Sequence, residues 1–322
     1  MGRQRKKYLF NKFSDNLKYF VNVKVDSRLV DAYLCPIGMS LHSTKGLEGD
    51  SNDPLTEEHV PPRSMGGGAI CLVRKDINSI SGHSIDKMLL DHFRYRSFMN
   101  ENGAYPVRIN TDHEHLRFMN GELIIGKREN RPFLHFNLGD KNLQNFKKKV
   151  VDKGVFPGSG YSVKIQEPKV NTQLLNSGFL KIAYLKAFSK IGYSLIYNPD
   201  GEINPTYEKV RQQILNPEEN IIEYLPVFYK NIPPVDGIYI VGSPESLRSL
   251  MVTFNIVIDD NVESFMVVLP LPSDSIFKVY DAFQGYKENS GLYPELHFHQ
   301  IKELKFDENR LDAYWLYRLL KT

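Results

Sequence analysis

The spacing of apolar side chains divides the chain into helical and extended segments. Between residues 174 and 191 they recur every three or four positions, which is the period of an amphipathic helix. This helix is expected to carry its lysines, Lys181, Lys186 and Lys190, on a separate polar arc. A second helix is expected over residues 205–215, and a closing helix over residues 311–320.

Extended segments rich in β-branched and aromatic residues surround these helices. The runs at 249–258 and 263–269 flank the turn at residues 259–262, as in an antiparallel hairpin. The runs at 122–125 and 131–136 flank a second polar turn in the same way. Further strands are expected over residues 237–241 and 296–299. This mixture of helices and antiparallel strands predicts the α+β fold class.

Proline and glycine cluster at residues 155–160, directly after a lysine run, and this cluster is typical of a domain boundary. We therefore expect a basic, aromatic N-terminal arm over residues 1–30, a domain over residues 31–154 and a mixed α+β domain over residues 155–322. The last of these is expected to select a target, sense a ligand or mediate assembly.

The strongest local pattern predicts two strands, a glycine loop and a helix between residues 55 and 93. The first strand must end near Pro61-Pro62, because proline donates no hydrogen bond to a sheet. Gly66 to Gly68 then allow positive φ angles or a close approach to a ligand. After a second strand at 69–73, Asp76 or Asn78 is expected to cap one helix that continues through residue 93.

This pattern places an acid and a histidine, Glu58-His59, about twenty residues before an amide, Asn78. Phosphodiester hydrolysis needs a base for the attacking water, and a neutral imidazole such as His59 suits that task. It also needs a hard divalent cation, which prefers oxygen ligands such as those of Glu58 and Asn78. Adjacent strand residues point to opposite faces, so Glu58 and His59 share one site only if the chain bends there.

These residues resemble the HNH endonucleases with the ββα-metal fold. The resemblance rests on Glu58-His59-Val-Pro-Pro, on Gly66-Gly67 and on the spacing Asn78-x-x-x-Gly-x-x-x-Asp86, and it covers about sixty residues, 33–92. It implies that His59 is the general base and that Glu58 and Asn78 bind the metal, Mg²⁺ or another divalent ion such as Mn²⁺ or Ni²⁺. The segment at 180–193 also resembles what often follows this module in bacterial and phage proteins.

The sequence departs from that family where many members carry two Cys-x-x-Cys knuckles for a structural zinc. The corresponding segments here are Cys35-Pro-Ile-Gly38 and Arg74-Lys-Asp-Ile77, so three of the four thiolates are absent. A structural zinc needs four nitrogen or sulfur ligands, and the offset Cys71 does not restore the set. We expect no structural zinc, and we expect apolar packing of Ile37, Leu72 and Ile77 in its place.

Several flanking residues have both a functional and a structural interpretation. His83 is either a further metal or phosphate contact or a surface histidine, and Arg63 and Arg74 are either phosphate contacts or ordinary surface charges. Asp86 is expected to pair with a basic side chain. His113 and His115 are expected to be loop residues rather than a metal pair.

Charge is concentrated at the N-terminus, although the net charge of the whole chain is only +3. The first 24 residues hold seven basic side chains against one acid, interleaved with aromatic residues. Either they form an arm that contacts nucleic acid, for instance through Lys6 and Lys7, or they pack their aromatic side chains into the core and leave the lysines in water.

Composition favours a cytoplasmic protein. Two cysteines give no disulfide framework, and no run of residues is apolar enough to predict a membrane span. The N-terminus lacks the apolar core of a signal peptide. At 322 residues the chain is long enough for two domains.

Three hypotheses about function follow from the sequence. The first is a metal-dependent endonuclease, with DNA favoured over RNA. The second is a nucleic-acid-binding protein on a catalytically decayed scaffold. The third is a nuclease that its C-terminal domain keeps silent until a ligand or partner arrives. A homodimer or a partner subunit would suit cleavage of both strands.

Overall fold

The structure is a computed structural model, and it describes residues 2–21, 31–48, 52–100, 103–111, 118–128, 131–138, 143–144, 147–148, 161–165, 167–198, 201–229, 236–272, 275–290 and 295–300. Its contacts group the chain into two units. Unit 1 comprises Met1–Met88, Asn171–Ile256 and Glu263–Thr322, and unit 2 comprises Leu89–Val170 and Val257–Val262. The domain boundaries expected at residues 30 and 154 stay a prediction.

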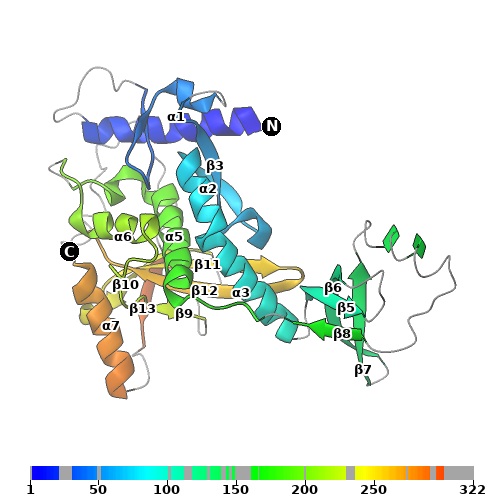
Figure 1. The fold of residues 1–322 in the computed structure, drawn as a ribbon. Helices are drawn as coiled ribbons and strands as arrows, with labels where there is room; N and C mark the ends of the chain where they lie inside the picture. Colours follow the sequence, from blue (N-terminus) through cyan, green and yellow to red (C-terminus); the bar gives the residue numbers. More distant parts are fainter. Residues whose placement is uncertain are drawn as a thin grey trace. The chain divides into compact units, whose positions relative to one another are not determined.

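Unit 1 begins with helix α1 (Gly2–Val21), the short strands β1 (Tyr33–Leu34) and β2 (Leu41–His42) and a 3-10 turn, η2 (Thr44–Leu47). An antiparallel hairpin follows, β3 (Leu55–Val60) and β4 (Gly68–Arg74), whose loop holds the 3-10 turn η3 (Arg63–Met65). The chain then enters α2 (Lys75–His83) and α3 (Ile85–Met99) (Figure 1). The expected strand, loop, strand and helix are therefore present.

Two details of that expectation are wrong. The helical region is two helices rather than one, because α2 ends with Ser84 as its C-cap. Neither expected cap is used: Arg74 is the N-cap residue, without a side-chain capping bond. The Asp76 carboxylate instead accepts two bonds from the Arg74 guanidinium, and the Asn78 amide bonds to β3. Asp76 also accepts a bond from the backbone N–H of Ile77, but Asp76 and Asn78 both lie inside α2 rather than at its N-cap position.

Helix α5 (Thr172–Ile191) is the buried centre of unit 1, and it confirms the helix expected over residues 174–191. Asn171 caps it by accepting bonds from the backbone N–H groups of Gln173 and Leu174. Almost every residue after its second turn is buried, which is typical of a helix that is apolar on all sides. The expected polar arc is therefore wrong for Lys181, whose side chain is only 3% exposed.

Helix α1 packs its aromatic side chains into this core. Phe13 stacks on Phe188 of α5 with ring centroids 4.6 Å apart, and Phe10 and Phe20 are buried as well. Lys6 donates to the carbonyl oxygen of Leu55 in β3. The side chain of Tyr8, in contrast, is 64% exposed. Of the two interpretations of the basic segment, the described contacts of α1 favour packing into the core.

The C-terminal part of unit 1 is a five-stranded antiparallel sheet with helices α6 (Pro205–Leu215) and α7 (Ile276–Ser290) and the turns η5 (Gly192–Leu195) and η6 (Glu245–Leu247). Its order is β13-β10-β11-β12-β9, with bounds His297–Gln300, Gly237–Ser243, Leu250–Ile258, Asn261–Leu269 and Val227–Phe228. The expected hairpin of β11 and β12, the strands β10 and β13 and the helix α6 are confirmed. The closing helix expected over residues 311–320 lies outside the described residues.

Unit 2 is built on a four-stranded antiparallel sheet of order β7-β6-β5-β8. These strands are β5 (Ala104–Thr111), β6 (Phe118–Arg128), β7 (Arg131–Leu138) and β8 (Tyr161–Lys164). The hairpin expected over residues 122–136 is confirmed as β6 and β7. The proline and glycine cluster at 155–160 lies outside the described residues. His113 and His115 also lie outside them. The α+β class is confirmed.

Among the described helices, none is both long enough and apolar enough to cross a membrane.

The packing of α1 gives a test of its role. Phe13→Ala should lower the free energy of unfolding by about 3–5 kcal/mol, because it removes a buried ring that is stacked on Phe188. Urea denaturation followed by circular dichroism measures this loss. Tyr8→Ala is the matched control on the same helix and should change stability by about 0.5 kcal/mol or less, because that ring is exposed. Equal effects of the two variants would contradict the packing of α1 into the core.

Candidate active site around the β3–β4 hairpin

The loop between β3 and β4 depends on two of its three glycines. Gly66 adopts φ 82°, in the left-handed region that side chains with a Cβ rarely enter. A Cβ on Gly67 would lie 1.4 Å from the carbonyl oxygen of Pro61, so the two backbone segments approach too closely for any other residue. A Cβ on Gly68 would meet nothing within 4 Å. Gly66 and Gly67 therefore allow the chain to turn from β3 into β4.

The hairpin carries a β-bulge at the Glu58-His59 pair. Glu58 pairs with Cys71, whereas His59 pairs with Ala69, so β4 contains one additional residue at this point. A bulge increases the local twist and re-aims nearby side chains. Burial still alternates along β3: Glu58 is buried, His59 is half-buried and Val60 is buried again. The chain is thus irregular at this pair, but among the described residues no hydrogen bond or ion pair joins the carboxylate to the imidazole.

Glu58 is held by a lysine that the sequence did not single out for this task. Its Oε1 lies 2.9 Å from Nζ of Lys181 on α5, and the side chains of both residues are 3% exposed. The same ammonium donates to both carboxylate oxygens of Asp86, at 3.0 and 3.1 Å. The expectation that Asp86 pairs with a basic side chain is confirmed. Three elements, β3, α3 and α5, thereby meet at one buried ion cluster.

The electrostatics of this cluster follow from burial. Burial raises the pKa of Glu58, and the Lys181 ammonium offsets this only in part because it is shared with Asp86. Burial also raises the pKa of Asp86, and Lys181 again opposes the shift. Burial lowers the pKa of Lys181, but its two carboxylate partners outweigh that effect and raise it. The two carboxylates thus favour the ammonium form of Lys181.

Asn78 ties helix α2 to strand β3. Its Nδ2 donates to Oγ1 of Thr56 at 2.9 Å and to the carbonyl oxygen of Glu57 at 3.3 Å. The side-chain amide therefore holds the strand immediately before the Glu58-His59 pair. The carbonyl oxygen is the only remaining atom of this side chain that is able to coordinate a cation.

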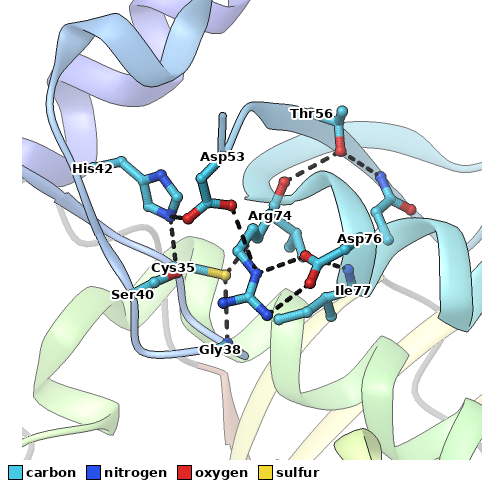
Figure 2. A network of polar contacts seen from close by, with 11 residues as sticks. Cys35, Gly38, Ser40, His42, Asp53, Thr56, Arg74, Asp76 and Ile77 are labelled. Carbon is cyan, nitrogen blue, oxygen red and sulfur yellow. Dashed lines mark hydrogen bonds and ion pairs between the residues drawn. The ribbon is translucent and has the colours of Figure 1, made fainter. Parts of the chain in front are cut away.

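Four residues that the sequence comparison set against two Cys-x-x-Cys knuckles come together in space: Cys35, Gly38, Arg74 and Ile77 (Figure 2). The sulfur of Cys35 accepts from the backbone N–H groups of Gly38 at 3.4 Å and Arg74 at 3.5 Å. Gly38 faces Ile77, whose Cδ1 would lie 2.5 Å from a Cβ at residue 38. Burial raises the pKa of the Cys35 thiol. A thiol, a glycine and an isoleucine thus fill this corner.

The expected apolar packing at this corner is confirmed, because Ile37, Leu72 and Ile77 are all buried. Side chains of the C-terminal part of unit 1 hold the same segment. Tyr184 on α5 donates to the carbonyl oxygen of Pro36 at 2.6 Å, and the Arg211 guanidinium on α6 donates to that of Ile37 at 2.9 Å.

The remaining candidate residues are spread around the hairpin. Arg63 is exposed in η3 and Lys7 is exposed on α1, while Lys6 is bound to the carbonyl oxygen of Leu55. His83 is exposed at the end of α2, with Nδ1 2.6 Å from the carbonyl oxygen of Ser79. Arg74 is already paired, to Asp76 at 2.6 Å and Asp53 at 3.7 Å, and Figure 2 shows its guanidinium between the two.

Lys181 is the residue that reasoning from sequence missed. The available signal was the composition of residues 174–191, which is apolar on nearly every side. A lysine in such a helix is buried whichever way it points, and a buried ammonium is stable only when carboxylates pair with it. Nothing in the sequence indicated which carboxylates these would be.

Comparisons with known proteins returned no matching family model, no curated protein and no solved structure. Among the described residues, no group of three or more histidine, cysteine, aspartate or glutamate side chains is arranged to hold a metal ion.

The hairpin loop provides a second test. Gly67→Ala should destabilise the protein by about 1–3 kcal/mol or more, because the added methyl group overlaps the backbone of Pro61. Gly68→Ala, one residue later, meets open space and is the matched control. Thermal unfolding of the two variants beside the wild type measures the difference. A melting temperature for Gly67→Ala equal to that of Gly68→Ala would contradict the described loop.

His42 predicts a pH dependence of stability. Its ring is buried, and burial lowers the pKa of His42 below 6.5 although Asp53 opposes the shift. A histidine with a lowered pKa stabilises the fold above its ordinary pKa, and that stability is lost as the pH falls through the folded-state pKa. The loss in the free energy of unfolding between pH 7.5 and pH 5 should be smaller in His42→Gln than in the wild type. Parallel pH profiles from urea denaturation would count against this assignment.

Proposed function

We propose that this protein is a metal-dependent endonuclease that hydrolyses phosphodiester bonds, with DNA as the preferred substrate. The observation that carries the proposal is the arrangement of β3, β4 and α2. His59 lies half-buried at a bulge of the hairpin, and Asn78 of the following helix binds the strand two and three residues before it. This arrangement agrees with the resemblance of the sequence to HNH nucleases.

The proposed roles follow from the available atoms. The imidazole of His59 takes a proton from the attacking water. Asn78 acts first as a positioning residue, since its amide fixes the backbone at Glu57. Exposed basic residues beside the hairpin, Arg63 and Lys7, would contact phosphate groups. A homodimer would bring two such sites to opposite strands of a duplex.

The residues fit a divalent cation in one respect. Oε2 of Glu58 is buried and has no hydrogen-bond partner among the described residues, so it is an oxygen donor of the kind that Mg²⁺, Mn²⁺ or Ni²⁺ accepts. Glu58 and the carbonyl oxygen of Asn78 would hold the ion, with His83 as a further candidate. The bound cation would stabilise the negative charge that develops on the phosphate.

The ion pair between Glu58 and Lys181 favours a second candidate function. If Lys181 permanently neutralises the acid, the hairpin binds nucleic acid through its basic residues without cutting it. Because Lys181 belongs to α5, the same contact also suits a nuclease that the C-terminal half keeps silent. A partner or ligand that moves α5 would then release Glu58.

A cleavage assay separates these candidates. Plasmid DNA, single-stranded DNA and RNA are incubated with the wild type in Mg²⁺, Mn²⁺ or Ni²⁺. His59→Ala should lower the cleavage rate by about 10²–10⁴-fold, which is the usual contribution of a general base. Asn78→Ala should also lower it. His297→Ala, which replaces an exposed histidine on β13, is the matched control and should cleave at the wild-type rate.

Two outcomes contradict the proposal, the first its nuclease activity and the second its general base. Binding of nucleic acid without cleavage, unchanged in His59→Ala, selects the decayed scaffold. Cleavage by the wild type that persists in a folded His59→Ala variant removes the proposed base. Activity that arises only after a partner or small molecule is added supports control by the C-terminal half.

A further inference from the structure

The ammonium of Lys181 occupies a position surrounded by carboxylate oxygens. One oxygen of Glu58 lies 2.9 Å from Nζ, and the two oxygens of Asp86 lie at 3.0 and 3.1 Å. The carboxylates come from different elements, β3 and the first turn of α3, and converge on this one point. A spherical cation with oxygen ligands requires the same kind of convergence.

The charges of this cluster do not cancel. Two carboxylates face one ammonium, so the cluster carries one excess negative charge when all three groups are ionised. The surroundings are nearly dry, since the Glu58 and Lys181 side chains are 3% exposed and that of Asp86 is 15% exposed. In addition, Oε2 of Glu58 has no hydrogen-bond partner among the described residues. Buried excess charge with an unused donor atom favours the uptake of a cation.

We propose that Glu58 and Asp86 form a divalent-cation position in which Lys181 is the resident cation, so that the ammonium and a divalent ion exclude each other. An ammonium in contact with Oε1 repels a divalent ion at the same carboxylate, and the low exposure of the cluster weakens solvent screening of that repulsion. Lys181 therefore competes with a divalent ion for Glu58, and the metal-loaded state of the proposed nuclease requires the ammonium to leave this carboxylate. The effect of this competition on catalysis rests on the proposed nuclease function.

The geometry indicates what exchange requires. The oxygens lie 2.9–3.1 Å from Nζ, whereas Ca²⁺ binds oxygen at about 2.3–2.6 Å and Mg²⁺ at about 2.0–2.1 Å. Each carboxylate oxygen must therefore move toward the ion by roughly half an ångström or more. The movement is smaller for Ca²⁺ than for Mg²⁺. Asp86 is the most exposed of the three groups, so its side of the cluster is the route by which an ion enters.

Metal binding tests this inference without reference to cleavage. Mn²⁺ is titrated into the full-length wild type and Lys181→Met, and the free ion is counted by electron paramagnetic resonance. We expect Lys181→Met to bind one Mn²⁺ at least tenfold more tightly than the wild type, because it removes the competing charge and keeps most of the stem. Lys181→Arg keeps the cation and should behave as the wild type. The double variant Lys181→Met/Glu58→Gln should lose the gain.

A stability measurement covers the case in which Lys181→Met folds poorly. Mn²⁺ should raise the melting temperature of Lys181→Met and of Lys181→Gln, and should raise that of the wild type much less, because an ion that binds only the folded state stabilises it. If neither variant gains Mn²⁺ affinity or Mn²⁺-dependent melting temperature, the inference is overturned. It is also overturned if the gain survives Glu58→Gln.

The two proposals fail separately. A protein that cleaves no substrate but gains Mn²⁺ binding through Lys181→Met retains the cation position and loses the nuclease. A protein that cleaves through His59, but whose Lys181 variants show no gain, retains the nuclease and loses the resident lysine.

Discussion

The ion cluster of Glu58, Lys181 and Asp86 is the contact on which the architecture of unit 1 depends. A lysine in the middle of a helix with apolar neighbours is tolerated only if carboxylates meet it, because an unpaired buried ammonium is costly. Meeting it fixes the rotation of α5 against the β3–β4 hairpin and the start of α3. The acid of the Glu58-His59 pair is thereby committed to a structural partner as well as to any chemistry.

A second constraint operates at the corner formed by Cys35, Gly38, Arg74 and Ile77. The contacts there are individually weak: two N–H bonds to the Cys35 sulfur and close packing of Gly38 on Ile77. Buried neighbours and the donors from α5 and α6 add to them. Because Asn78 follows Ile77 directly, this corner also sets where the Asn78 amide reaches β3. Contacts within the protein therefore hold this corner, including the donors from α5 and α6.

These contacts join the hairpin to α5 and α6 in one structural unit. Helix α1 covers the hairpin through Lys6, and α5 reaches it through Lys181. Residues 1–88 and 171–256 therefore share a core, although the sequence separates them by a long β-rich segment. A displacement of α5 would therefore act directly on Glu58 through Lys181.

The sequence by itself determined the elements. Hydrophobic periodicity and turn residues predicted α5, α6, the β6–β7 and β11–β12 hairpins and the β3–β4 hairpin with its helix. These elements depend on residues near one another in the chain. The motif also nominated Glu58, His59 and Asn78. Only the tertiary structure decided that Lys181 is buried, that Asn78 holds β3 instead of capping α2, and that the helical region breaks at Ser84. The first two depend on partners brought close by folding, 123 residues away in sequence for Lys181 and Glu58, and local periodicity carries no information about such partners.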